Sequence, residues 1–397
     1  MRLLVMSNEF RPFIIGGLGI VATELTNALA QDKTCQITVL TKGPKRYGQV
    51  RSLDNLKVVR LPQQSSYTSR THFFPEPLEQ WLLQQPDDPP ELLHVHSVQC
   101  LELALRCRAR WNIPLVYTCH SLVLHEKANA ERELVVARQE RLLVEADSIT
   151  VPSLWLQEEI EHKYPRCQGK ITIIPNGVTL HNAASRPINH PLLFVGRLIP
   201  VKGIEELLHA IALLRAEDPH VKLSVIGTGT ERYTKHLHKL CEDLGLSDSV
   251  RWLGHRSHQE VHRAYTAAGA VLVPSRSESF GLTALEALAA GAPLVATQSG
   301  GLSHYIDEKV ASVLSDISPQ TIAAGIRSMW QDPERTARRT AEGLKLAARF
   351  SWAEIAFRYG ALFQALIAER GGKNAKTPLE TRTALERETP RTSLGGA

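Results

Sequence analysis

The segment SESFGLTALEALAAG, residues 277–291, places Glu278 and Glu286 eight positions apart in a loop and a helix rich in alanine and leucine. An unpaired carboxylate at Glu286 would cost several kcal/mol, because its apolar neighbours remove it from water. We therefore expect a polar partner there. Gly281 lets the backbone N–H groups and the positive end of the helix dipole face an anion. A phosphate fits this helix start and a ribose hydroxyl pair fits Glu286; a helix with one solvent-facing glutamate is the simpler alternative.

Two cations follow an apolar run in VGRLIPVKG, residues 195–203. Arg197 comes directly after Gly196, and Lys202 stands where the next helix is expected to begin. Both would lie at the carboxyl edge of a parallel sheet, where a diphosphate needs its charge neutralised. Two unrelated surface cations are the alternative.

Glycine-rich turns occur at IIGGLG, residues 14–19, and at GTGTER, residues 227–232. The first lies between an expected strand and helix and lets the backbone approach a ligand closely. Neither has the G-x-G-x-x-G spacing of a dinucleotide site, and no Walker A loop is present. The glycines therefore do not indicate a dinucleotide site.

His120 ends the apolar run LVYTCH and is expected to project from the carboxyl edge, although a structural role is the commoner one for such a histidine. His94 and His96 alternate on one strand face, where we expect packing. No Asp-x-Asp pair or Cys-x-x-Cys pair is present, so the sequence predicts no metal site and no cofactor. The six cysteines are expected to be reduced and mostly buried.

The composition, with 43% hydrophobic and 22% charged residues, is typical of a soluble globular protein. The apolar run at residues 3–6 is too short for a signal peptide, so a cytoplasmic location is expected. No apolar run is long enough to span a bilayer. The net charge of +5 is spread along the chain, which argues against a nucleic-acid partner and suits a small anionic ligand. Arg106, Arg108 and Arg110 leave a weak membrane-surface contact open, but a solvated helix face is favoured. A homodimer is also left open.

Apolar runs alternate with helical stretches through the first half of the chain, which predicts a parallel sheet covered on both faces. A first helix is expected from about Gly19 to Gln31, and another is expected to end at Trp111. The expected strands are 2–7, 36–41, 57–62, 92–97, 114–119, 148–153 and 171–175.

The irregular segment 175–191 predicts a linker, after which the same alternation begins again. Helices are expected in this half from Lys202, Glu231 and Pro319 and within the segment 277–291. The expected strands are 192–197, 222–227, 250–254, 270–275 and 293–297. The fold class is therefore α/β, with two doubly wound, Rossmann-like domains facing across a ligand-binding cleft. The predicted parts are an N-terminal domain at 1–180, a C-terminal domain at 190–350, a helix at 351–370 packing back toward the first domain, and a disordered tail at 371–397.

In the order of its motifs, the chain resembles the GT-B glycosyltransferases of family 4, which are retaining nucleotide-sugar transferases. The segments that carry the resemblance are FVGRLIPVKGIEELLHAIALL, LSVIGTGTE, VRWLGHRSHQEV and PSRSESFGLTALEALAAGAPLVAT. It covers about residues 1–370 and is most specific in the C-terminal half. It implies two Rossmann-like domains and a donor site in the second.

The resemblance also implies roles for individual residues. Glu278 would face the donor sugar, Glu286 would hold the ribose hydroxyls, and Arg197 and Lys202 would neutralise the diphosphate. His120 would contact the sugar. The other implied donor-binding residues are Gly17, Gly19, Gly227, Arg256 near the base, Ser279, and the backbone of Phe280, Gly281, Leu282 and Thr283.

The N-terminal half has mixed features: TCHSLVLHEK and RQERLLVEADSITVPS resemble enzymes with small polar acceptors, and NEFRPFIIGGLG resembles glycogen synthases. The predicted reaction is metal-independent, retaining transfer of a glucose-type or N-acetylglucosamine-type group, with UDP as the favoured carrier, to a small polar hydroxyl acceptor. A lipid or polysaccharide acceptor is the nearest alternative. A nicotinamide-dependent oxidoreductase and a non-catalytic nucleotide-sugar sensor are more distant ones.

Overall fold

The computed structural model describes residues 1–43, 49–61, 89–123, 132–180 and 191–371. The predicted tail at 371–397, apart from Gly371, and most of the predicted linker lie outside the described residues. Within these residues, no helix combines the length and the hydropathy needed to cross a membrane.

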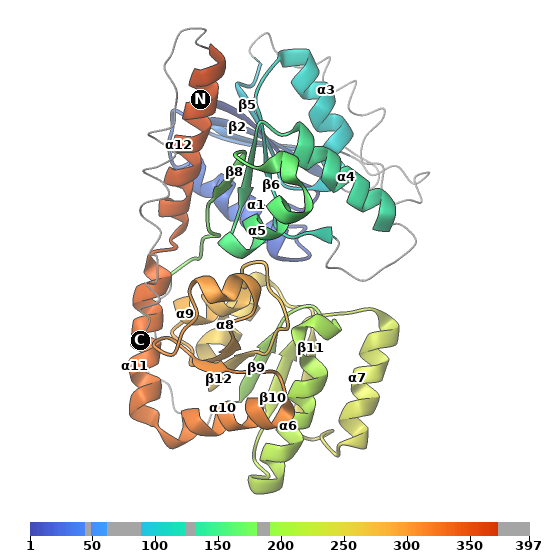
Figure 1. Ribbon diagram of the computed structural model, residues 1–397, viewed down its shortest axis with the longest axis vertical. Helices are drawn as coiled ribbons and strands as arrows, with labels where there is room; N and C mark the ends of the chain where they lie inside the picture. The colour runs from blue at the N-terminus through green and yellow to red at the C-terminus, as the bar shows by residue number, and fades with distance from the viewer. Residues whose placement is uncertain (44–48, 62–88, 124–131, 181–190, 372–397) are drawn as a thin grey trace. The chain divides into compact units, whose positions relative to one another are not determined.

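The chain forms two compact units (Figure 1). Unit 1 comprises Met1–Gly177 together with Trp352–Ala397, and unit 2 comprises Val178–Ser351. The C-terminal helix, α12 (Trp352–Gly371), therefore belongs to unit 1, where it packs against α1 (Gly17–Leu29). The chain thus returns to its first unit after completing the second.

Unit 1 is built on an eight-stranded sheet with the order β3-β4-β2-β1-β5-β6-β7-β8. All of its strand pairs are parallel except β3 with β4. Its strands are β1 (Arg2–Met6), β2 (Gln36–Lys42), β3 (Gln49–Leu53), β4 (Leu56–Leu61), β5 (Leu92–Val95), β6 (Leu115–Thr118), β7 (Ser148–Val151) and β8 (Ile171–Ile173), and its other helices are α3 (Leu101–Trp111), α4 (Arg132–Glu145) and α5 (Leu154–Lys163), with short 3₁₀ turns η1 (Val98–Cys100) and η3 (Pro165–Cys167).

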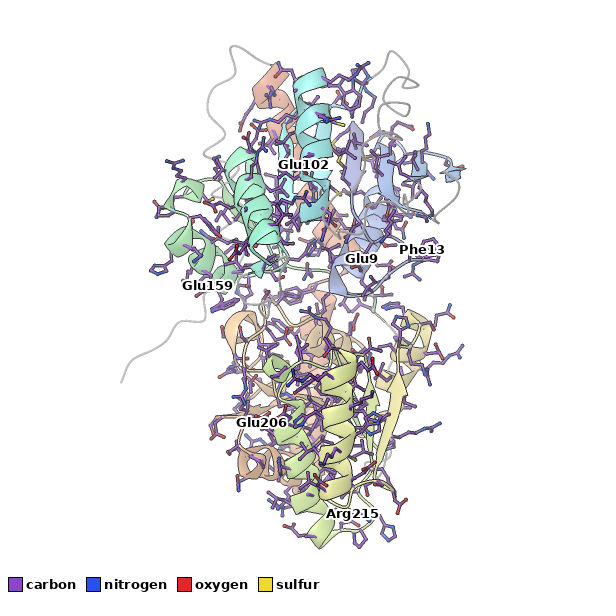
Figure 2. The ribbon with its side chains drawn as sticks, turned by 90° about the vertical axis from the view of Figure 1, so that its right-hand side faces the viewer. Glu9, Phe13, Glu102, Glu159, Glu206 and Arg215 are labelled. Atoms are coloured by element: carbon purple, nitrogen blue, oxygen red, sulfur yellow. The ribbon has the colours of Figure 1, made fainter. Side chains whose placement is uncertain are left out.

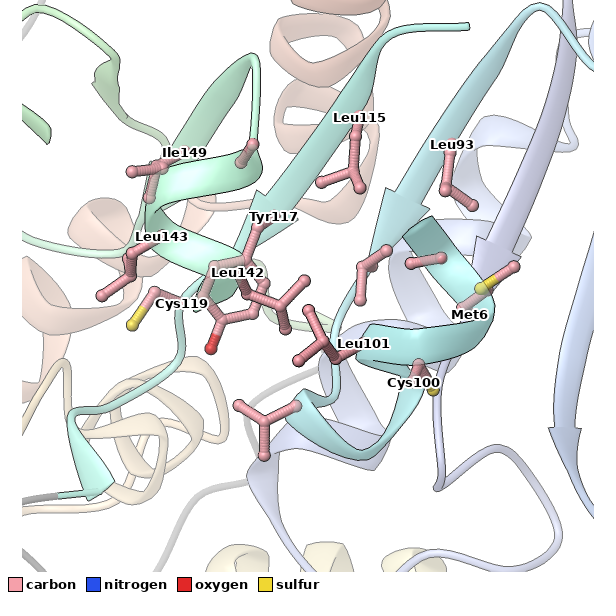
Figure 3. Packing of buried hydrophobic residues seen from close by; sticks show 14 of the residues in the cluster. Met6, Leu93, Cys100, Leu101, Leu115, Tyr117, Cys119, Leu142, Leu143 and Ile149 are labelled. Atoms are coloured by element: carbon pink, nitrogen blue, oxygen red, sulfur yellow. The ribbon is translucent and has the colours of Figure 1, made fainter. Parts of the chain in front are cut away.

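Helices bury both faces of this sheet, which explains why its strands are continuous apolar runs. Residues of α3, α4 and α5 share one core with β5, β6 and β7, and Figure 3 shows Leu142 of α4 beside Tyr117 of β6 and Leu101 of α3. Residues of α1 and α12 share the other core with β1 and β2. The six cysteines are all buried thiols, as predicted.

The edge strand β3 was missing from the sequence prediction. It pairs antiparallel with β4 through a tight turn at Asp54 and Asn55, and the φ angle of Asp54 is 45°. The Asn55 amide donates to the carbonyls of Ala30, Asp32 and Cys35. The turn is thus tied to the end of α1, a long-range contact that the polar run QVRSL does not reveal.

Unit 2 is built on a six-stranded, fully parallel sheet with the order β11-β10-β9-β12-β13-β14. Its strands are β9 (Leu192–Val195), β10 (Leu223–Ile226), β11 (Val250–Gly254), β12 (Ala270–Val273), β13 (Leu294–Thr297) and β14 (Ser312–Leu314), and its helices are α6 (Ile204–Glu217), α7 (Glu231–Asp243), α8 (His258–Ala267), α9 (Leu282–Ala289), α10 (Pro319–Gln331) and α11 (Pro333–Ala348), with 3₁₀ turns η4 (Pro200–Lys202) and η5 (Gly300–His304).

The two faces of this second sheet are covered in the same way. Residues of α6, α7 and α10 form one core, and residues of α8, α9 and α11 form the other. Both sheets follow the doubly wound order, in which the winding reverses between the first and fourth parallel strands. The reversal lies between β1 and β5 in unit 1 and between β9 and β12 in unit 2.

Two helix starts differ from the prediction. The first helix begins at Gly17 rather than about Gly19, so that Gly17 belongs to its first turn. The helix expected from Lys202 begins instead at Ile204, because η4 and Gly203 come first. Gly203 has a φ of 68°, a left-handed conformation that ends the 3₁₀ turn and redirects the chain into α6.

Candidate functional site

The carboxyl edge of unit 2 gathers charged residues at the point where the strand winding reverses. β9 and β12 are neighbours there, and polar segments follow each of them. Arg197 comes two residues after β9 and is exposed, and Lys202 closes η4. Glu278 lies in the loop between β12 and α9. Ligands of doubly wound sheets bind at such a reversal, so the sequence-predicted cations and Glu278 occupy the expected edge.

Lys202 and Glu278 contact each other directly. The Lys202 Nζ donates to Glu278 Oε1 at 2.5 Å, and the two side chains are 19% and 12% exposed. Ser275 donates its hydroxyl to the same oxygen at 2.8 Å. Because the pair is largely shielded from water, it is stronger than a surface ion pair. The ammonium and the carboxylate, predicted to meet the diphosphate and the sugar, therefore form one small cluster.

A close backbone approach brings this cluster together. A Cβ atom at Gly203 would lie 2.1 Å from the carbonyl oxygen of Pro274, so only glycine fits there. The N–H of Arg276 donates to the carbonyl of Val201 at 2.8 Å, which holds the two loops side by side. The sequence K-G at the start of α6 thus places Lys202 against the loop that follows β12.

The N-terminus of α9 lies on the same loop. Its N-cap residue, Gly281, has a φ of 89° and no side-chain cap, so the first turn is not closed by a polar side chain as most helix starts are. The Tyr305 hydroxyl donates to the Gly281 carbonyl at 2.7 Å, and Thr283 donates to the Val195 carbonyl. The Phe280 side chain is 2% exposed and packs against Tyr305. Ser279 and Leu282 flank these positions. The contacts of Tyr305, Thr283 and Phe280 fix the start of the helix against the rest of unit 2.

Glu286 lies one turn further along α9 and has the polar partner that we expected from the sequence. Tyr265 of α8 donates its hydroxyl to Glu286 Oε2 at 2.9 Å. Burial raises the pKa of Glu286 to about 7, although the Tyr265 hydrogen bond acts in the opposite direction. The carboxyl group is therefore poised between its two protonation states near neutral pH.

Gly227 and Arg256 follow β10 and β11 at the same edge of the sheet. Gly227 has a φ of 139°, and a Cβ atom there would lie 1.8 Å from the Gly196 carbonyl oxygen. The backbone next to Arg197 can therefore pass close to the β10 loop only because Gly227 has no side chain. Arg256 contacts the His255 carbonyl and Glu260, so its guanidinium is directed toward its own loop and the start of α8.

In unit 1, the loop between β1 and α1 is organised by Glu9, which Figure 2 labels together with Phe13. Glu9 Oε2 accepts from the N–H groups of Ile15 and Gly16 at 2.8 and 3.0 Å. A Cβ atom at Gly19 would lie 2.8 Å from Glu9 Oε2, so this glycine leaves room for the carboxylate. Gly17 is exposed in the first turn of α1. A carboxylate of the protein itself thus binds the glycine-rich loop that the sequence assigns to the donor.

His120 also belongs to unit 1, where it joins a row of histidines. His96 Nδ1 and His120 Nε2 are 3.1 Å apart, and the rings of His94 and His96 are 4.2 Å apart. His94 Nε2 is 2.7 Å from the Thr118 hydroxyl. Burial lowers the pKa of His120 to about 4 and that of His94 to about 3, and it holds the pKa of His96 well below the usual value. The three imidazoles are therefore neutral at physiological pH.

The described residues contain no group of three or more His, Cys, Asp or Glu side chains arranged to hold a metal ion.

Two family models match the chain. The model described as "Glycosyltransferase Family 4" matches residues 15–182, and the model described as "Glycosyl transferases group 1" matches residues 188–345. Among curated proteins, the D-inositol 3-phosphate glycosyltransferase of Thermobispora bispora is 31% identical over 300 residues, which cover 69% of this chain and 70% of that protein. The glycogen synthase of Mycobacterium tuberculosis is 28% identical and covers 96% of this chain and 98% of that protein.

Solved structures share the fold. Sucrose-phosphate synthase from Thermosynechococcus elongatus superposes with a TM-score of 0.77 at 23% identity, covering 93% of this chain and 99% of that one. The Anabaena protein HepE gives a TM-score of 0.73 at 19% identity, with 92% and 100% covered. The two doubly wound units have the GT-B fold. The chain belongs to glycosyltransferase family 4, and the oxidoreductase and sensor alternatives are set aside.

Three residues near the carboxyl edges of the two sheets were not assigned a functional role from the sequence. Tyr265 gives no signal, because its contact with Glu286 depends on how α8 packs on α9. Glu9 is the third residue after β1 at a carboxyl edge, a position that marks it only once the loop is known to fold back. His96 was assigned to packing, and its alternation with His94 was the available signal for its contact with His120.

Proposed function

We propose that this protein transfers a hexosyl group from a nucleoside diphosphate sugar to a hydroxyl group of a small polar acceptor, with the α configuration retained. The observation that carries the proposal is the cluster of Lys202, Glu278 and the uncapped start of α9 at the strand reversal of unit 2. The Lys202 ammonium and the N-terminus of α9 lie on two adjacent loops, and both can bind the negatively charged diphosphate of such a donor.

The chemical barrier lies in breaking the bond between C1 of the sugar and the phosphate oxygen. This step builds positive charge on the sugar ring and negative charge on the departing diphosphate. Lys202, Arg197 and the start of α9 stabilise that negative charge, and they do so without a metal ion. The leaving phosphate oxygen then takes the proton of the acceptor hydroxyl as the new C1–O bond forms on the same face of the sugar.

The other residues bind and orient in this proposal. Glu278 holds hydroxyl groups of the sugar, and its pairing with Lys202 keeps the two groups in place. Glu286 accepts hydrogen bonds from the ribose. The base of the donor is assigned to the loops around Gly227 and Arg256. His120, neutral because of its low pKa, donates or accepts a hydrogen bond to the sugar and does not act as a general base, which would give an inverted product.

The relatives support a nucleotide-sugar donor and favour UDP. Structures of HepE are described with UDP and with UDP-glucose, and one of starch synthase IV with ADP and acarbose. The carried sugar is accordingly proposed to be of the glucose or N-acetylglucosamine type. The protein is proposed to act in the cytoplasm.

The identity of the acceptor is proposed from the relatives. D-inositol 3-phosphate, named for several relatives, is a small polar acceptor. A polysaccharide acceptor is the second candidate, because the glycogen synthase relative matches nearly the full length of the chain. We assign acceptor selection to unit 1.

The decisive experiment incubates the protein with UDP-, GDP- and ADP-sugars in the absence of acceptor and follows release of the nucleoside diphosphate. We expect slow hydrolysis of one or two UDP-sugars, unaffected by EDTA. Polyol phosphates and glucan oligomers are then added separately, and the anomeric proton coupling of the product is measured. Absence of turnover with every donor, with and without acceptors, would refute the proposal, and a β product would refute retention.

A further inference from the structure

Tyr265 has a fully buried side chain, and its hydroxyl group contacts the candidate site at Glu286. The side chain is 1% exposed and lies near the end of α8, in the core formed with α9. Its hydroxyl is 2.9 Å from Glu286 Oε2. A buried tyrosine normally satisfies its hydroxyl, and here it does so with a carboxylate that the proposed function uses.

Among the described residues, this is the one hydrogen bond that the Glu286 carboxyl group receives. The phenol supplies a single donor, and that donor is committed to Oε2. Oε1 is left to accept hydrogen bonds from elsewhere. A carboxylate fixed at one oxygen by a rigid, packed ring has lost most of its rotational freedom before any ligand arrives, which lowers the entropic cost of binding.

We propose that Tyr265 is the positioning residue of the nucleotide subsite: its hydroxyl holds Glu286 so that Oε1 receives the vicinal hydroxyl pair of the ribose. This inference rests on the proposed function, in which Glu286 binds the ribose. It adds a residue that touches no substrate and acts only through the Glu286 carboxylate.

The protonation state of Glu286 supports the same role. Burial raises the pKa of this carboxyl group, and the Tyr265 hydroxyl counteracts part of that rise. Hydrogen bonding to the charged form favours that form. Tyr265 therefore increases the share of Glu286 that is ionised at neutral pH, and an ionised carboxylate is a stronger acceptor for the two ribose hydroxyls than a protonated one.

The test is a cycle of two proteins and two ligands, measured by isothermal titration calorimetry. UDP is compared with 2′,3′-dideoxy-UDP, which lacks both ribose hydroxyls, in wild type and in Tyr265→Phe. We expect Tyr265→Phe to weaken UDP binding about tenfold, the size of one hydrogen bond to a charged group, and to leave dideoxy-UDP binding unchanged. An equal loss for both ligands means a merely structural role and overturns the inference.

The wild-type arm separates this inference from the proposed function. If wild type binds none of UDP, GDP and ADP, or binds UDP and its dideoxy analogue equally well, the assignment of Glu286 to the ribose fails. If wild type prefers UDP and Tyr265→Phe keeps that full preference, only the role of Tyr265 fails. Tyr117→Phe serves as the matched control, because it removes another buried hydroxyl, bonded to Gln139 in unit 1, and should change neither affinity.

A second variant keeps the test valid if Tyr265→Phe does not fold. In Glu286→Gln a neutral amide replaces the carboxylate, so that removing the phenol hydroxyl no longer leaves a buried charge unpaired. The double variant, Tyr265→Phe with Glu286→Gln, should bind both ligands as Glu286→Gln alone does. A further loss of affinity in the double variant would show that Tyr265 acts by another route and would overturn the inference.

Discussion

The carboxyl edges of the two sheets carry different chemistry on the same strand order. In unit 2, the strand reversal presents the Lys202–Glu278 pair, the start of α9 and the Tyr265–Glu286 pair. In unit 1, the equivalent region presents histidines that burial keeps neutral and a glycine-rich loop bound by Glu9.

In the proposed function, this difference divides the transfer reaction between two copies of one scaffold. In that proposal, the cations of unit 2 lie where the diphosphate is stabilised. The histidine row of unit 1, His94, His96 and His120, is called the neutral edge below, because burial keeps its imidazoles uncharged. The winding order determines where each site lies, but the residues after each strand determine what the site can do. The predictions below test whether the charged and the neutral edge really differ in this way.

The largest effect is expected from removing a cation of unit 2. Lys202→Ala or Arg197→Ala should lower kcat by on the order of a hundredfold or more, as loss of a contact to a leaving group does. Steady-state kinetics with a saturating nucleotide sugar measures this. Lys222→Ala is the matched control, because Lys222 is an exposed lysine of the same unit whose ammonium donates to the Asp248 carbonyl. Near-normal rates in both site variants would contradict their assignment.

The sequence was sufficient to predict most of the architecture. The strands of both sheets appear as apolar runs because each is buried on both faces, and their order of alternation with helices predicts the doubly wound fold. The strand β3 was missed because its run QVRSL is largely polar. The strand β14 was also missed, and its three residues do not explain this, since β8 is equally short and was predicted. The helices α4, α5 and α11 were not predicted individually.

The site was predictable in its members but not in its contacts. Lys202 and Glu278 could be placed at one edge, because both follow strands of the same parallel sheet. Their direct pairing could not be predicted, since it depends on the left-handed conformation of Gly203 and its approach to Pro274. The partner of Glu286 was required on energetic grounds, yet its identity as Tyr265 depends on the packing of two helices.

The second prediction concerns pH and separates the two edges. Because the pKa of Glu286 is raised to about 7, its carboxyl group is ionised above neutral pH and protonated below it. Tyr265 and Tyr305 are the ionisable groups that influence it, and both keep their protons in this range because burial raises the pKa of each. We expect kcat/KM for the donor to fall about tenfold between pH 8 and pH 6.

The neutral edge should contribute nothing to this profile, because the pKa of His120 is about 4. Glu286→Gln should give a flat profile between pH 6 and pH 8, at a lower overall value. A nucleotide sugar is the proper substrate here, since its diphosphate does not titrate in that range. A decline near pH 6.5 that survives in Glu286→Gln would show that a histidine carries the pH dependence instead.

The third prediction concerns stability and has opposite signs in the two units. Burial lowers the pKa of His94 to about 3, so that below pH 6.5 the unfolded chain takes up a proton that the folded one does not. The free energy of unfolding should therefore fall as the pH decreases from about 6.5. For Glu286, whose pKa is raised, the folded protein holds the extra proton, and stability should fall as the pH rises from 4.5 to about 7.

Each effect is limited to about 1.4 kcal/mol per pH unit. Urea unfolding at pH 5 and pH 7 measures it, with wild type compared with His94→Gln and Glu286→Gln. His94→Gln should remove part of the loss at low pH, and Glu286→Gln should remove part of the loss at neutral pH. Identical changes between the two pH values in all three proteins would contradict the opposite signs.

The last prediction concerns the glycine-rich loop of unit 1. A methyl group at Gly19 would lie 2.8 Å from both Cβ and Oε2 of Glu9, whereas one at Gly16 would meet nothing within 4 Å. Gly19→Ala must therefore displace Glu9 from the N–H groups of Ile15 and Gly16, and it should destabilise the protein by about 1–2 kcal/mol. Gly16→Ala, at an extended φ of −154°, should have no such effect. Urea unfolding of both variants measures the difference. Equal stabilities would show that the Glu9 contact does not hold this loop. A loss of donor affinity only in Gly19→Ala would show that the glycine-rich loop also contributes to donor binding.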